Sequence, residues 1–231
     1  MLLELKDLEV GYSKKIVVHG LSMGIDQGEI VALIGHNGAG KTTTLKCILG
    51  LLQPTRGKII YKGGDITGYS PADKVRHGIS FLPQERFIFP ELSVRENLDI
   101  GAYTVEDDAE STIERIYQLF PILNERARQR SSTLSGGERR MLGLGMILLT
   151  KPQLLLLDEP SLGLAPVLVK SFMEMLKNIR EEFGTSILLV EQNVKQAMEI
   201  ARRVYVMKMG RIILEENAST LLQRDEWWDL F

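Results

Sequence analysis

The sequence predicts an α/β protein in which a parallel sheet carries an inserted helical block and the N-terminal part adds antiparallel strands. Three observations predict this fold. Apolar strand-like runs alternate with helical segments on both sides of a stretch of helices, short strands and turns open the chain, and a glycine-rich loop joins one strand to one helix. The 231 residues are 44% apolar and 25% charged, as in an ordinary globular protein, and their net charge of −2 argues against a surface that coats nucleic acid.

The N-terminal part is predicted to be rich in strands. The first two strands are expected to pair antiparallel, because the turn residues Gly11-Tyr12-Ser13 lie between them. The next strand is apolar throughout, which is typical of burial on both faces. A helix follows it and ends near Gly50 and Pro54. The predicted elements are strands over 3–10, 16–25, 30–34 and 58–61 and a helix over 42–51.

The rest of the chain is predicted to be a helical block followed by alternating strands and helices. The block extends from Ser93 to Thr150, and the strand after it contains four consecutive leucines. A hairpin around Met209-Gly210 closes the pattern. The predicted helices are 93–103, 107–120, 135–149, 167–183 and 194–202, and the predicted strands are 154–158, 186–191, 204–207 and 211–215.

Residues 35–42, with the sequence GHNGAGKT, fit the phosphate-binding pattern GxxxxGK[ST]. A strand precedes them and a helix follows, which is the structural context that this pattern needs. The glycines let successive backbone N–H groups point at one anion, Lys41 adds a positive charge, and the Thr42 hydroxyl is a ligand for Mg²⁺. The sequence therefore predicts a binding site for a nucleoside triphosphate.

Two further motifs narrow this prediction. Residues 134–138, LSGGE, lie upstream of residues 154–160, LLLLDEP. Together with the phosphate loop they make the whole chain resemble the ATP-binding subunit of an ATP-binding-cassette (ABC) transporter. The resemblance implies a single nucleotide-binding domain over 1–231 with a RecA-like P-loop NTPase core. In it, residues 1–85 and 152–231 form the core with its antiparallel β-subdomain, and 86–151 form the helical subdomain.

The resemblance also implies the roles of the site residues. Tyr12 would stack on adenine, Asp158 would hold Mg²⁺ through water, and Glu159 would orient or deprotonate the attacking water. Gln84 would meet both the metal and that water. The signature residues would cap the γ-phosphate of ATP held by the opposite subunit. The residues expected to contact ATP are Tyr12, Gly35, His36, Asn37, Gly38, Ala39, Gly40, Lys41, Thr42, Thr43, Ser135, Gly136, Gly137 and Glu138; those for Mg²⁺ are Thr42, Gln84 and Asp158.

The sequence departs from the family pattern at three positions. Glu138 replaces the glutamine of many members, and it stands where a capping box would place a glutamate. Gln192 replaces the usual switch histidine, so it is expected to donate a hydrogen bond to the γ-phosphate without becoming a cation, and to support slower hydrolysis. Leu164 replaces an acid of many members, so communication across a dimer is expected to differ.

Residues 159–166, EPSLGLAP, and 190–193, VEQN, resemble the branched-chain amino-acid branch of ABC importers. This implies a second cassette, identical or related, two membrane-spanning permeases, an extracytoplasmic binding protein, and a peripheral position on the cytoplasmic face of the membrane. The alternatives are a cassette for urea or amide uptake, a cassette for lipopolysaccharide export, and a non-transport ABC ATPase. The apolar segment 84–96 is expected to receive a permease helix, and Trp227 and Trp228 either pack on the core or bind a partner.

Overall fold

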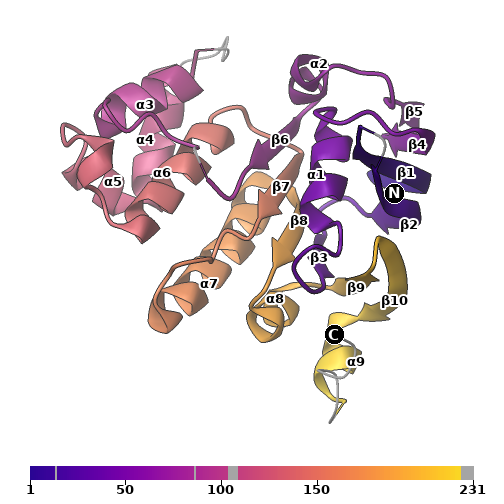
Figure 1. Cartoon of the computed structure of the whole chain (residues 1–231). Helices are drawn as coiled ribbons and strands as arrows, with labels where there is room; N and C mark the ends of the chain where they lie inside the picture. Colours follow the sequence, from indigo (N-terminus) through magenta and orange to yellow (C-terminus); the bar gives the residue numbers. More distant parts are fainter. Residues whose placement is uncertain (14, 86, 104–108, 225–231) are drawn as a thin grey trace.

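Two sheets form the scaffold of the computed structural model, which describes residues 1–13, 15–85, 87–103 and 109–224 (Figure 1). The smaller sheet has the strand order β2-β1-β4-β5 and is antiparallel, as predicted. The larger sheet has the order β10-β9-β3-β8-β7-β6, with β9 to β6 parallel and β10 antiparallel to β9. The strands are β1 (Leu3–Tyr12), β2 (Lys15–Ile25), β3 (Ile30–Ile34), β4 (Arg56–Tyr61), β5 (Gly64–Asp65), β6 (Ile79–Leu82), β7 (Leu154–Asp158), β8 (Ser186–Glu191), β9 (Arg203–Lys208) and β10 (Arg211–Asn217).

The central strands are buried on both faces, because each face of the larger sheet supports its own apolar cluster. In β3, Val31 and Leu33 belong to the cluster shared with the antiparallel sheet, whereas Ile30, Ala32 and Ile34 belong to the cluster shared with the helices. This alternation follows from the two-residue period of a strand. Helix α1 (Lys41–Leu49) contributes Leu45 and Ile48 to the first cluster, so it packs between the two sheets.

The helices on the other face divide into two groups (Figure 1). Helices α3 to α6 lie together at the end of the molecule away from the antiparallel sheet, and α7 to α9 follow the later strands. The helices are α2 (Pro71–Arg76), α3 (Val94–Gly101), α4 (Ala109–Leu119), α5 (Pro121–Glu125), α6 (Gly136–Leu148), α7 (Pro166–Phe183), α8 (Val194–Ile200) and α9 (Ala218–Leu222), with a 3₁₀ turn at Ser131–Thr133. Within the described ranges, no helix combines the length and the apolar character needed to cross a membrane.

The sequence predicted most of the elements within a few residues and missed several short ones: α2, α5, α9, β5 and β6. Helix α2 has six residues and β5 has two, so neither contains enough residues to display a period. The predicted helix over 107–120 is described from Ala109 onward. The two tryptophans near the end of the chain, Trp227 and Trp228, lie outside the described residues.

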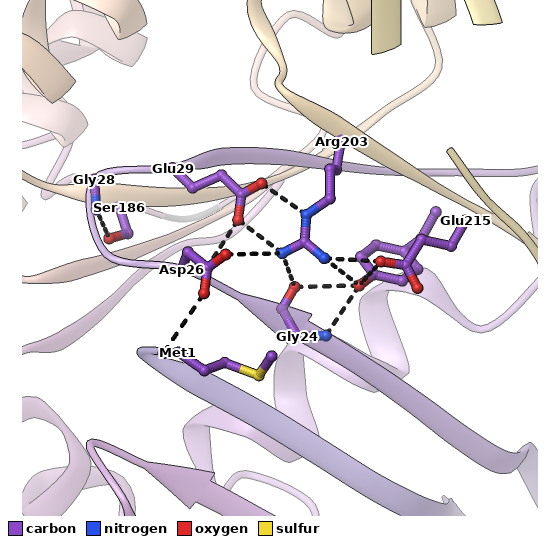
Figure 2. Close-up of polar contacts among 9 residues, drawn as sticks. Met1, Gly24, Asp26, Gly28, Glu29, Ser186, Arg203 and Glu215 are labelled. Carbon is purple, nitrogen blue, oxygen red and sulfur yellow. Dashed lines mark hydrogen bonds and ion pairs between the residues drawn. The ribbon is translucent and has the colours of Figure 1, made fainter. Parts of the chain in front are cut away.

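An ionic network around the buried carboxylate of Glu29 joins the two sheets (Figure 2). The guanidinium of Arg203, on β9, donates two hydrogen bonds of 2.8 Å to the carboxylate of Glu29, which is 3% exposed. It also donates to Gly24 O of β2 at 3.1 Å and to Glu215 of β10 at 2.8 Å. The Tyr205 hydroxyl donates to the same Glu215 carboxylate at 2.9 Å. One side chain therefore joins two parts of the chain that are distant in the sequence, 24–29 and 203–215.

We expect Arg203→Met to lower the free energy of unfolding by about 3–5 kcal/mol, because it leaves the Glu29 carboxylate buried without its partner. Urea denaturation measures this loss. The neighbouring Arg202 is exposed, so Arg202→Met is the matched control and should change stability by about 0.5 kcal/mol or less. Equal effects of the two substitutions would show that the network contributes nothing.

Candidate functional site

The phosphate loop begins directly after β3 and ends at the first residue of α1. Its glycines are required by close backbone approach and by backbone conformation. At Gly35 an added Cβ would lie 2.2 Å from Met207 O on β9, and Gly38 has φ +80°, a conformation that L-residues rarely adopt. Gly40, with φ +111°, precedes the first turn of α1. The loop therefore curls against β9 and leaves the N-terminus of α1 open to an anion.

Lys41 is folded back into this loop. Its Nζ donates to the carbonyl oxygens of Gly35 at 2.7 Å and His36 at 3.1 Å, and lies 3.8 Å from Oε1 of Glu159. Burial lowers the pKa of the Lys41 ammonium, and the Glu159 and Asp158 carboxylates oppose that shift. A cation that is 4% exposed is thus held at the centre of the loop by oxygen atoms alone.

Asp158 is the last residue of β7, and its carboxylate reaches across to α1. Its Oδ1 accepts a hydrogen bond from Thr42 Oγ1 at 3.0 Å. Burial raises the pKa of the Asp158 carboxyl, the Thr42 hydrogen bond opposes that rise, and the neighbouring charge of Glu159 adds to it. A hydroxyl and a carboxylate in contact form the hard oxygen pair that suits Mg²⁺, which binds few protein ligands and keeps water or phosphate oxygens for the rest. The residues present fit that metal.

Glu159 is held by two side-chain amides from distant parts of the chain. Its Oε2 accepts from Nε2 of Gln84 at 3.2 Å and from Nε2 of Gln192 at 2.7 Å. Gln192 also donates to Oδ1 of Asn37 in the phosphate loop at 3.0 Å. Glu159 has φ +49°, a conformation that costs a non-glycine residue energy and that is frequent at functional sites. The three predicted catalytic residues, Glu159, Gln84 and Gln192, therefore meet at one carboxylate oxygen.

These side chains line a pocket of about 310 Å³ above the phosphate loop. Gly35, His36 and Ala39 shape the loop without lining that pocket. Val17 of β2 lines it too, a residue that was not predicted because an apolar residue in a strand carries no functional signal. The lining residues are Val17, Asn37, Gly38, Gly40, Lys41, Thr42, Thr43, Gln84, Glu159 and Gln192.

Tyr12 lies apart from this pocket, at the end of β1. Its ring is 44% exposed, and Nζ of Lys46 on α1 lies 5.9 Å from the ring centroid. The residue therefore lies beside the first helix, partly open to solvent, with the Lys46 ammonium over its ring.

The signature residues lie in the helical block and do not line the pocket of the phosphate loop. Ser135 caps α6, and the predicted capping box with Glu138 is confirmed: Ser135 N donates to Oε2 of Glu138 at 2.7 Å, and Glu138 N donates to Ser135 Oγ at 3.3 Å. Glu138 also pairs with Arg126 at 3.0 Å. Gly136 lines a different cavity, of about 680 Å³, together with Gln84 and Leu164.

The Gln84 loop is attached to the same helix. Nη1 of Arg140, on α6, donates to Pro83 O at 3.4 Å, and the guanidinium carbon of Arg140 lies 4.7 Å from the centroid of the Phe87 ring. Gly143 makes room for that ring, because an added Cβ would lie 2.5 Å from Phe87 Cδ2. The residues on both sides of Gln84 therefore contact α6.

We expect Asp158→Asn to raise the melting temperature at neutral pH while abolishing metal-dependent turnover. A carboxyl with a raised folded pKa loses stability as the pH rises from its unfolded value, near 3.8, through the folded pKa. The advantage of the amide should therefore be absent below about pH 4 and grow as the pH rises above that value. Each 1 kcal/mol relieved corresponds to about 2–4 °C in a chain of this size, measurable by calorimetry at several pH values. A lower melting temperature at pH 7 would contradict the assigned cost of burial.

Comparison with known proteins agrees with this geometry. Residues 18–162 match the family model described as ABC transporter. The chain is 42% identical to the branched-chain amino acid transport ATP-binding protein BraG of Pseudomonas aeruginosa, and 36% identical to the probable branched-chain amino acid transport ATP-binding protein LivF of Archaeoglobus fulgidus. Each match covers 95% of this chain and 94% of the relative. The lipopolysaccharide export protein LptB of Escherichia coli K12 is 33% identical over 94% of this chain and 91% of its own length.

Solved structures agree as well. The cbiO1 cassette of Clostridium perfringens, described as part of the transporter complex cbiONQ, has a TM-score of 0.88 and 27% identity, covering 97% of this chain and 92% of that one. A further ATP-binding subunit of an ABC transporter has a TM-score of 0.85 and 28% identity, covering 100% of this chain and 98% of that one. Cassettes of this family work as dimers with membrane permease subunits. The chain belongs to the ABC transporter family, as an ATP-binding and ATP-hydrolysing subunit.

Proposed function

We propose that this chain powers an importer of branched-chain amino acids by hydrolysing ATP at the pocket above the phosphate loop. The main support for an ATPase site is the position of the Glu159 carboxylate. Gln84 and Gln192 orient it, and it lies beside Lys41. The cargo is proposed from BraG and LivF, whose names specify branched-chain amino acids and which match this chain over nearly their whole length.

The proposed mechanism assigns each side chain one task. The loop N–H groups and Lys41 bind the phosphates, and Thr42 and Asp158 would hold Mg²⁺ together with Gln84. When bound, the metal would neutralise phosphate charge. Glu159 orients the attacking water and accepts its proton, and the two glutamine amides keep the carboxylate pointed at that water. Tyr12, exposed at the end of β1, would stack on adenine.

A second cassette completes the site in this proposal. Ser135, Gly136, Gly137 and Glu138 begin a helix of 13 residues, whose N-terminus favours an anion, yet they lie away from the pocket of their own chain. They are proposed to cap the γ-phosphate in the partner cassette. The division into a core with β-subdomain, 1–85 and 152–231, and a helical subdomain, 86–151, gives the two parts that move relative to one another.

The permeases are proposed to dock where the Gln84 loop meets the helical block. A cavity of about 410 Å³ lies there, lined mainly by apolar side chains that include Phe81, Ile88, Phe89 and Met146. Phe89 is 48% exposed, as expected for a residue that a partner covers. In this arrangement the chain is peripheral on the cytoplasmic face of the membrane, and an extracytoplasmic binding protein selects the cargo.

We expect Glu159→Gln to reduce ATP turnover by about 10²-fold or more, because the amide cannot accept the proton of the attacking water. The variant should still bind ATP and accumulate as an ATP-bound dimer, visible by size-exclusion chromatography with light scattering. Glu182 is exposed on α7, so Glu182→Gln is the control and should keep the unmutated rate. Turnover of Glu159→Gln at the unmutated rate would refute the assigned role.

We expect Lys41→Ala to weaken ATP binding by at least about tenfold, because it removes the charge at the centre of the loop. Isothermal titration with ATP and Mg²⁺ measures the change. Lys170 is exposed on α7, and Lys170→Ala should bind ATP like the unmutated chain. Unchanged affinity in Lys41→Ala would place the nucleotide elsewhere.

The cargo is tested by purifying the tagged chain from gently solubilised membranes and identifying its companions by mass spectrometry. Two permeases and a second cassette are expected, and the reconstituted complex with its binding protein should import leucine, isoleucine or valine. Co-purification with lipopolysaccharide-export components would favour the function of the LptB relative. Recovery of ribosomes or nucleic acid would favour a non-transport ATPase, and transport of urea or amides would reassign the importer.

A further inference from the structure

Glu191 is a buried carboxylate to which the mechanism above gives no task. It is the last residue of β8 and is 1% exposed. Both of its oxygens accept hydrogen bonds from backbone N–H groups: Oε1 from Ser161 at 2.8 Å, and Oε2 from Gln192 at 3.1 Å and Asn193 at 3.4 Å. Burial raises the pKa of this carboxyl, and these N–H donors oppose the rise.

This environment is costly for a residue whose purpose is packing. A buried carboxylate without a counter-ion is among the least favourable groups in a protein interior. Among the described residues no lysine or arginine lies within ion-pair distance of Glu191; Lys41 and Arg140 act on it only as more distant charges. An apolar residue would remove the charge but would leave three backbone N–H groups without their acceptor. The role of this buried carboxylate therefore lies in the segments that its hydrogen bonds connect.

These hydrogen bonds connect the loop after Glu159 to the loop after β8. Ser161 stands two residues after Glu159, and Gln192 follows Glu191 directly. A second tie joins the same loops, because Nδ2 of Asn193 donates to Oγ of Ser161 at 2.6 Å. Gln192 and Glu159 belong to these two connected loops. The connection therefore fixes the distance of 2.7 Å from Nε2 of Gln192 to Oε2 of Glu159.

We propose that Glu191 is a positioning residue for ATP hydrolysis: its carboxylate clamps the two loops so that the Gln192 amide holds Glu159 toward the attacking water. This inference rests on the ATPase site proposed above. Glu191 does not itself line the pocket, and it contacts the lining only through the backbone N–H of Gln192, so we expect the clamp to act on the rate of the chemical step and to leave nucleotide affinity unchanged. Misplacement of a reacting group by about 1 Å can cost about 10²-fold in rate.

The decisive variant is Glu191→Gln in the full chain. A carboxamide has the shape of a carboxylate but one acceptor oxygen, so in either orientation its NH₂ faces the N–H groups of one loop. We expect kcat for ATP to fall about tenfold or more, and the Kd for ATP to stay within about twofold. Hydrogen exchange followed by mass spectrometry should show faster exchange in one of the two loops, either at the amide of Ser161 or at those of Gln192 and Asn193, because the N–H groups that face the NH₂ lose their acceptor.

Glu29→Gln is the matched control. Glu29 is also a buried carboxylate, 3% exposed, but it belongs to the Arg203 network (Figure 2) and lies just before β3, at the opposite end of the parallel strands from Glu191. This substitution should lower stability without lowering kcat at a temperature where the variant is folded. If Glu191→Gln keeps the unmutated kcat, or loses activity only in proportion to its folded fraction as the control does, the positioning role is wrong.

Asn193→Ala decides the case if Glu191→Gln fails to fold. It removes only the tie to Ser161 Oγ, and we expect kcat to fall about threefold with unchanged Kd for ATP, consistent with the loss of one hydrogen bond. An unchanged kcat in that variant would overturn the clamp. If the unmutated chain with its partners hydrolyses no ATP, the proposed function itself is refuted and the positioning role falls with it, while faster exchange in Glu191→Gln would still establish the tie between the loops.

Discussion

The parallel hydrogen bonding of β3, β8 and β7 is the constraint on which the candidate site depends. In this register Ile34 lies opposite Glu191, and Val190 lies opposite Asp158, so the three strands end at the same edge of the sheet. The phosphate loop, the acidic pair and the Gln192 loop all leave the sheet at that edge, where ligands of open α/β sheets bind. A slip of one residue would turn Asp158 toward the opposite face and separate it from Thr42.

The site places several charged side chains in the protein interior, where an unpaired charge is most costly in free energy. Lys41, Asp158, Glu159 and Glu191 are all buried. The carboxylates accept hydrogen bonds from backbone N–H groups, a hydroxyl and side-chain amides, and the Lys41 ammonium donates to loop carbonyl oxygens. Such preorganised donors are effective in a water-poor pocket because they need no reorganisation during the reaction. The Glu29–Arg203 network has a structural role, because its bidentate ion pair connects the two sheets and is not part of the candidate site.

The sequence predicted features formed by residues close together in the chain, and it missed features that depend on tertiary contacts. The phosphate loop, the Ser135–Glu138 capping box and the acidic pair after β7 depend on residues close together in the chain, so their patterns are legible. Gln84 and Gln192 were identified through resemblance, but their common contact with one oxygen of Glu159 depends on strand register. Val17 and Glu191 were not predicted, because an apolar residue in a strand and an acid at a strand end have no distinctive pattern. Their surroundings, which only the folded chain supplies, distinguish them.

Helix α6 begins at the capped Ser135 and, one turn later, holds the Gln84 loop through Arg140 and the ring of Phe87. The face that would meet a partner cassette and the anchor of a catalytic amide are thus parts of one rigid rod. If α6 tilts as a rigid body, its N-terminus and the attached Gln84 loop move together. In the proposed mechanism, α6 would therefore couple engagement of the partner to the position of Gln84 directly, with no separate element between the helical block and Glu159.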